Sequence, residues 1–112
     1  MKPDELASAH CTPRKGEEHA LAAAEVERYL AHLPGWILSA DGKGIDKTYR
    51  FDDFHRTMAF VNAVAWIAHA EDHHPDLELG YAHCTVRYRT HAVGGVSIND
   101  LICAAKVDAL LP

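Results

Sequence analysis

The chain has 112 residues, a length that fits one domain with a modest hydrophobic core. Apolar residues make up 48% and charged residues 24%, and the 11 Lys and Arg against 16 Asp and Glu give a formal net charge of −5. No Lys/Arg run occurs, which argues against nucleic acid and against an anionic membrane surface as partners. No apolar stretch is long enough to span a membrane.

The first 19 residues are polar and show no hydrophobic periodicity. We therefore expect a flexible N-terminal arm over residues 1–19 and a single domain over residues 20–112. His10 and Cys11 could bind a metal ion, but two ligands make a weak site, and a solvated arm is the favoured interpretation. The cysteines of the chain form no CxxC pair, which predicts reduced thiols in a cytoplasmic protein.

A first helix is expected from about His19 to Leu33, because apolar side chains recur there at helical spacing and a Pro-Gly pair follows. Residues 36–40 and 45–51 then flank an Asp-Gly turn. The second of these runs alternates apolar and polar side chains, so the pair predicts a β-hairpin.

A second helix is expected to begin after Asp52 and Asp53, because acidic residues suit a helix N-terminus. Apolar side chains recur at helical spacing along the segment that follows. The helix should end near Asp72, because Pro75 disfavours helical backbone at His74.

Residues 77–81 and 84–88 each alternate, but in opposite phase, which predicts a tight hairpin or a bulge between them. Ser97 with Asp100 three residues later predicts the capped start of a last helix. The order of elements is therefore α-ββ-α-ββ-α. Hairpins favour an antiparallel sheet, and one-faced helices need a surface to cover, so we expect an α+β fold of two layers.

Histidines near the end of the second helix are candidate functional residues, because imidazole exchanges protons near neutral pH. His73 is expected in the last helical turn, where the helix dipole and the carboxylates of Glu71 and Asp72 favour the imidazolium form. That environment suits a proton donor. His74 is expected in extended backbone, so its ring should point in another direction.

His91 follows the last expected strand. If that strand end meets the helix end, three imidazoles line one pocket, and Asp100 could orient one of them through a hydrogen bond. Two other interpretations stay open. His69 and His73 have the helical spacing of two zinc ligands, with His74 or His91 as a third, although no glutamate occupies the HExxH position. The histidines could also be solvated and idle.

Taken with these histidines, the sequence resembles the bacterial pterin-4a-carbinolamine dehydratases over about residues 21–110. The segments LPGW, KTYRF with DDF, AFVNAV and GGVSIND carry part of the resemblance. The signature itself consists of His69, His73, His74, Pro75, Tyr81, His91 and Asp100.

The resemblance implies an antiparallel four-stranded sheet with three helices packed on one face, which agrees with the order of elements above. It implies a homodimer or homotetramer, no metal and no other cofactor. It also implies a substrate: 4a-hydroxytetrahydropterin, dehydrated to quinonoid dihydropterin in the recycling of a tetrahydrobiopterin-type cofactor. Because some family members stabilise a transcription factor or assist enzyme assembly, a non-catalytic protein-binding role is the alternative.

The family's catalytic histidines fall on His73, His74 and His91 of this chain. We expect His73 and His91 to act as the acid–base pair and His74 to hold the pterin. One departure concerns His69, which stands where the family often has an acidic residue. The residues expected to contact the substrate are Asp72, Pro75, Arg89, Thr90 and Asp100.

Overall fold

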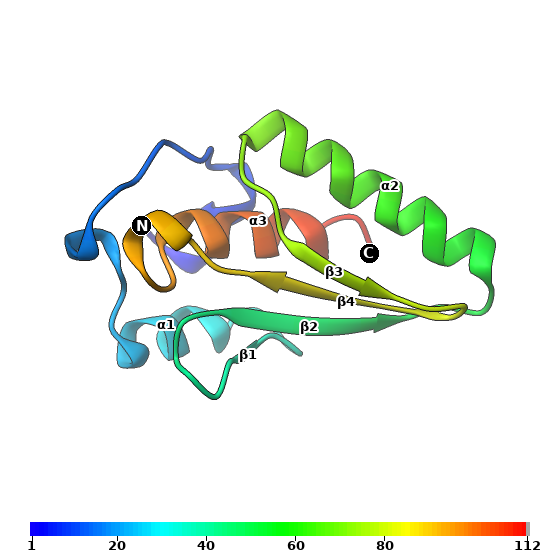
Figure 1. The fold of residues 1–112 in the computed structure, drawn as a ribbon, viewed down its shortest axis with the longest axis horizontal. Coiled ribbons are helices and arrows are strands. Elements are labelled where there is room, and N and C mark those ends of the chain that lie inside the picture. The colour runs from blue at the N-terminus through cyan, green and yellow to red at the C-terminus, as the bar shows by residue number, and fades with distance from the viewer. Residues whose placement is uncertain (112) are drawn as a thin grey trace.

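A four-stranded antiparallel sheet forms one layer of the molecule, with strand order β1-β2-β4-β3. The computed structural model describes residues 1–111, and Figure 1 shows the sheet with helices packed against it. The fold is α+β, as predicted. The strands are β1 (Ile37–Leu38), β2 (Ile45–Arg50), β3 (Asp76–Leu79) and β4 (His83–Tyr88).

The sheet presents one face to the core and the other to solvent. Ile45 pairs with Tyr88 and Tyr49 pairs with Cys84 across β2 and β4, and all four side chains are buried. Their neighbours along the strands are polar, so each strand alternates as its sequence predicted. The helices lie on the apolar face, where their buried residues join one core cluster.

Three α-helices build the second layer: α1 (Ala23–Leu30), α2 (Phe54–Glu71) and α3 (Ile98–Asp108). The side chain of Asp53 caps α2 by accepting the backbone N–H of Arg56 at 2.8 Å, as the acidic pair predicted. The predicted capping box of Ser97 and Asp100 is present at the start of α3.

The first helix is shorter than the predicted span from His19 to Leu33. Glu17–His19 form a separate 3₁₀ turn, η2, and the backbone N–H of Leu21 donates to the carbonyl of Val96 at 2.8 Å. This tertiary bond holds the chain in extended geometry before Ala23, so the helix begins later than its apolar spacing suggested.

The hairpin of β3 and β4 turns at residues 80–82, where the phase of the alternation changes. The Gly80 N–H donates to the carbonyl of His83 at 3.0 Å and closes the turn. Tyr81 belongs to the turn and is exposed, whereas its alternation with Leu79 had placed it on the strand. Among residues 1–111, no helix combines the length and the apolar character that a membrane crossing needs.

The N-terminal 19 residues lie against the domain in the structure. Their first turn is η1 (Pro3–Ser8), and its Leu6 is fully buried in the same core as α3. The Nζ atom of Lys106 on α3 donates to the carbonyl of Ala7 at 3.0 Å. Leu6 gave no periodic signal in the sequence, which is why the segment was interpreted as a loose arm. Its mobility in solution and the boundary at residue 20 stay predictions.

Candidate active site

The end of α2 positions the first candidate histidine. Asp72 takes the left-handed conformation, with φ 51° and ψ 44°, and the His73 N–H donates to the carbonyl of Ala68 at 3.2 Å. The bond joins two residues that are five positions apart, with the left-handed residue between them, which is the pattern of the Schellman motif. The turn stops the helix where Pro75 predicted and directs the His73 side chain towards α3.

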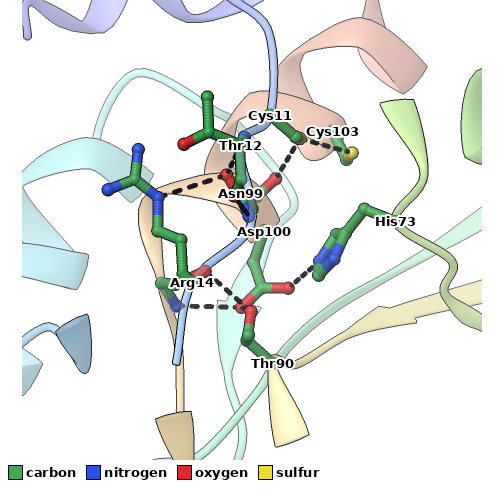
Figure 2. Close-up of polar contacts among 9 residues, drawn as sticks. Cys11, Thr12, Arg14, His73, Thr90, Asn99, Asp100 and Cys103 are labelled. Carbon is green, nitrogen blue, oxygen red and sulfur yellow. Dashed lines mark hydrogen bonds and ion pairs between the residues drawn. The ribbon is translucent and has the colours of Figure 1, made fainter. Parts of the chain in front are cut away.

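His73 is hydrogen-bonded to a buried carboxylate. Its Nε2 atom lies 2.6 Å from Oδ1 of Asp100, whose side chain is fully buried (Figure 2). The other carboxylate oxygen accepts the Thr90 hydroxyl at 2.8 Å and the Ser97 backbone N–H at 2.9 Å. A carboxylate only accepts hydrogen bonds, so Nε2 of His73 carries the proton. The expected orienting role of Asp100 therefore falls on His73.

The His73 ring is fixed on a second side by an aromatic residue. It stacks on Tyr88 of β4 with a centroid distance of 5.8 Å and an interplanar angle of 9°. The Tyr88 ring is fully buried, and its burial raises the pKa of the phenol far above the usual range. Tyr88 therefore stays neutral and acts as a rigid apolar platform. Within residues 1–111, Nδ1 of His73 has no hydrogen-bond partner, which leaves it available to a ligand.

A cavity of about 520 Å³ opens beside His73. Its volume falls in the range of small-molecule sites. Its wall is formed by residues 11–15, 71–74 and 89–92, together with Ala68 and Asn99.

Most of the residues predicted for the site line this cavity. His73 is half-buried, whereas His74 and His91 are exposed, and His91 is the first residue of the 3₁₀ turn η3 (His91–Val93). The lining also includes the predicted Asp72, Arg89 and Thr90. Two predicted residues, Pro75 and Asp100, are not part of the lining. Asp100 lies behind His73 and Thr90, where its carboxylate is bonded to both.

His69 does not join the histidines of the cavity. Its exposed ring packs on Trp66, with centroids 5.3 Å apart, whereas His73 one turn later is bonded to Asp100. Among residues 1–111, no group of three or more His, Cys, Asp or Glu side chains is arranged to hold a metal ion. A reaction without metal stays a prediction.

The N-terminal segment contributes a wall of the cavity that the sequence did not reveal. Glu71, at the end of α2, accepts the Cys11 backbone N–H at 2.7 Å and a ring nitrogen of His10 at 2.9 Å. Burial alone would raise the pKa of Glu71, but these two bonds and the charge of Lys106 outweigh it and lower that pKa. The Cys11 thiol also lies 3.6 Å from the thiol of Cys103 on α3. These contacts fix residues 11–15 over the cavity.

The fold and the cavity together define an α+β protein with a pocket lined by three histidines. Comparison with known proteins identifies the family. Residues 19–110 match the family described as Pterin 4 alpha carbinolamine dehydratase. A Stenotrophomonas maltophilia (strain K279a) protein with the provisional name pterin-4-alpha-carbinolamine dehydratase is 56% identical over 105 residues, which are 94% of this chain and 90% of that protein.

A Xanthomonas campestris pv. campestris (strain 8004) protein with the same provisional name is 57% identical, over 94% of this chain and 89% of its own length. The chain belongs to the pterin-4a-carbinolamine dehydratase family.

Two solved structures have a similar fold. A Brucella melitensis protein described as a transcriptional coactivator/pterin dehydratase superposes with a TM-score of 0.80 at 29% identity, covering 83% of this chain and 99% of that one. A pterin dehydratase-like protein described as a RuBisCO assembly factor gives a TM-score of 0.59 at 23% identity, covering 68% and 88%. The second likeness concerns the fold alone.

Proposed function

We propose that this protein is a dehydratase that converts 4a-hydroxytetrahydropterin to quinonoid dihydropterin and water, as part of tetrahydrobiopterin-type cofactor recycling. Family membership supports the pterin as substrate. The observation that carries the proposal is the hydrogen bond of His73 to buried Asp100 beside a cavity of about 520 Å³. We place the reaction in the cytoplasm, in a homodimer or homotetramer.

The reaction needs one proton delivered and one removed. The C4a–O bond breaks as the hydroxyl takes a proton and leaves as water. A base removes a ring N–H proton, and that electron pair forms the new C=N bond. No net proton or electron is gained or lost, so a pair of imidazoles is sufficient.

We assign the acid to His73 and the base to His91. The Asp100 carboxylate stabilises the His73 imidazolium and holds its Nε2, so that Nδ1–H is the proton offered to the leaving hydroxyl. His91 is exposed at the cavity, where a substrate can reach its ring, and is assigned to remove the ring N–H proton. His74, exposed at the same cavity, is assigned to hold the pterin ring.

The test is the dehydration rate of chemically generated 4a-hydroxytetrahydropterin, followed by stopped-flow absorbance. His73→Ala and His91→Ala should each lower kcat by about 10²–10⁴-fold. The double variant should lose less than the product of the single losses, because the two residues act on one step. His55→Ala is a matched control, because His55 is an exposed histidine on α2 that does not line the cavity.

Wild-type rates in folded His73→Ala and His91→Ala proteins would refute this assignment. An inactive wild type would favour the alternative, a protein-binding role on the same fold. The solved neighbour described as a transcriptional coactivator/pterin dehydratase motivates that alternative.

A further inference from the structure

The N-terminal strap, residues 10–16, is held over the cavity at several points. Asn99 of α3 bonds Thr12 twice, accepting its N–H at 3.3 Å and donating to its carbonyl at 2.7 Å. The strap ends at Gly16, whose N–H donates to the carbonyl of Ala92 at 3.0 Å. Gly16 has a φ of 91°, a conformation that favours glycine. The strap therefore has a defined position beside the histidines.

Arg14 is the residue of the strap best placed to bind a ligand. Its Nε atom donates to Oδ1 of Asn99 at 3.4 Å, which fixes the stem of a half-buried side chain (Figure 2). Its two terminal nitrogens have no partner among residues 1–111. Arg14 lines the same cavity as His73 and His91. A guanidinium that is hydrogen-bonded through one nitrogen and has free N–H groups on the other two is preorganised to bind a planar or tetrahedral anion.

The charges around the cavity favour an anion. Lys15 also lines it and has no carboxylate partner among residues 1–111, whereas the guanidinium of Arg89, a third lining cation, is paired with Asp41 at 3.4 Å. Of the two lining carboxylates, Glu71 is occupied by the strap, and Asp72 belongs to the helix end that carries His73. Two cationic side chains without a carboxylate partner among residues 1–111, Arg14 and Lys15, therefore lie at one cavity of a chain whose net charge is −5. A local field opposite to the overall charge attracts anionic ligands.

We propose that the strap is part of the substrate site and that Arg14, together with Lys15, binds an anionic group on the pterin side chain. The group is a carboxylate or a phosphate, which share the acceptor geometry that a guanidinium recognises. This inference rests on the proposed function, because it takes the ligand of the histidine pocket to be a pterin. Binding of this group would select among pterins by the charge of their side chains, a selection that the histidines cannot make.

The experiment compares three dihydropterins: one with a neutral polyhydroxypropyl side chain, one with the same side chain ending in phosphate, and one ending in a carboxylate. Dissociation constants are measured by calorimetry for the wild type and for Arg14→Gln, Arg14→Lys and Arg28→Gln. Arg28 is the matched control, because it is an exposed arginine on α1, paired with Glu25 and absent from the cavity.

The wild type should bind at least one anionic pterin roughly 10–100-fold more tightly than the neutral one, the range of one charged hydrogen bond. Arg14→Gln should remove most of this ratio, Arg14→Lys should keep part of it, and Arg28→Gln should leave it unchanged. A stronger response to phosphate or to carboxylate identifies the group. If Arg14→Gln does not fold, the ratio in the wild type should still fall as salt is raised from about 0.01 to 1 M.

Equal binding of neutral and anionic pterins by the wild type, with dehydratase activity present, would overturn this inference and leave the proposed function intact. An unchanged ratio in folded Arg14→Gln would overturn the role of Arg14. If no pterin binds and no dehydration occurs, the proposed function fails and the inference fails with it.

Discussion

Replacing Asp100 by asparagine tests the proton assignment at His73 directly. The amide has nearly the shape of the carboxylate but a single acceptor oxygen. In the wild type, Nε2 of His73 lies 2.6 Å from one carboxylate oxygen, and the other oxygen accepts the Ser97 N–H and the Thr90 hydroxyl. If the amide oxygen of the variant keeps the bonds from Ser97 and Thr90, its NH₂ group faces Nε2 of His73. Nε2 must then be unprotonated, so the proton of the neutral ring moves to Nδ1 and the imidazolium loses its charged partner.

The expected loss of activity follows from the one hydrogen bond between His73 and Asp100. A hydrogen bond to a charged group contributes about 1.5–3 kcal/mol. At about 1.4 kcal/mol per tenfold in rate, Asp100→Asn should lower kcat by roughly 10–150-fold. The cap of α3 is largely retained, so the stability loss should be about 1 kcal/mol, or roughly 4 °C in Tm for a domain of this size.

The assay combines stopped-flow dehydration, calorimetric melting and ¹⁵N NMR of the histidine rings, which distinguishes the two neutral tautomers. Ser97→Ala is the matched control: it removes the 2.7 Å bond between the Ser97 and Thr90 hydroxyls and leaves the carboxylate in place. It should lower Tm by a similar amount and change kcat by less than about threefold. A folded Asp100→Asn protein with wild-type kcat, or a wild-type His73 protonated at Nδ1 alone, would contradict the reasoning.

Three further outcomes are expected. The lowered pKa of Glu71 means that its bonds to the strap stabilise the fold above its usual pKa of 4.5 and lose this effect as pH falls. Urea unfolding should therefore show Glu71→Gln less stable than the wild type at pH 7 and closer to it at pH 3. In the same assay, Asp108→Ala should lower the free energy of unfolding by about 2–4 kcal/mol. The Asp108 carboxylate accepts hydrogen bonds from Lys47 at 3.0 Å, from the Trp36 indole at 3.1 Å and from the Tyr49 hydroxyl. The control, Glu25→Ala, removes one partner of an exposed ion pair and should lower it far less. Light scattering should give a dimer or tetramer, because the sheet has two edges that need cover; a 12.4 kDa particle at micromolar concentration would be the contrary result.

Sequence patterns predicted the parts of the fold that local chemistry determines. Asp53 and Ser97 mark helix starts for a local reason. The Asp53 side chain accepts a free N–H at the start of its own helix, and Ser97 and Asp100 each accept a backbone N–H in a capping box. Pro75 marked the end of α2 for an equally local reason. Even the contact of Asp100 with His73 could be anticipated, because the sequence located both the end of α2 and the start of α3.

The strap could not be predicted because its contacts, several of them made by backbone groups, join it to residues that are distant in the sequence. Cys11 and Thr12 use their amides to reach Glu71 and Asn99, and such bonds leave no periodic trace in the sequence. Arg14 alone in a polar segment is typical of a solvated arm. The first helix was overestimated for the same reason, since the bond from Leu21 to the Val96 carbonyl competes with helical geometry.

The strap also determines when the site can be completed during folding. Its bonds join Cys11 to Glu71 across 60 positions and Thr12 to Asn99 across 87. On a ribosome, the N-terminal residues emerge first, but Cys11 must wait for the end of α2 and Thr12 must wait for α3. Closing loops of this length costs entropy that only the finished core offsets. The wall that the strap adds to the pocket therefore depends on contacts that can form only after α3 has been made.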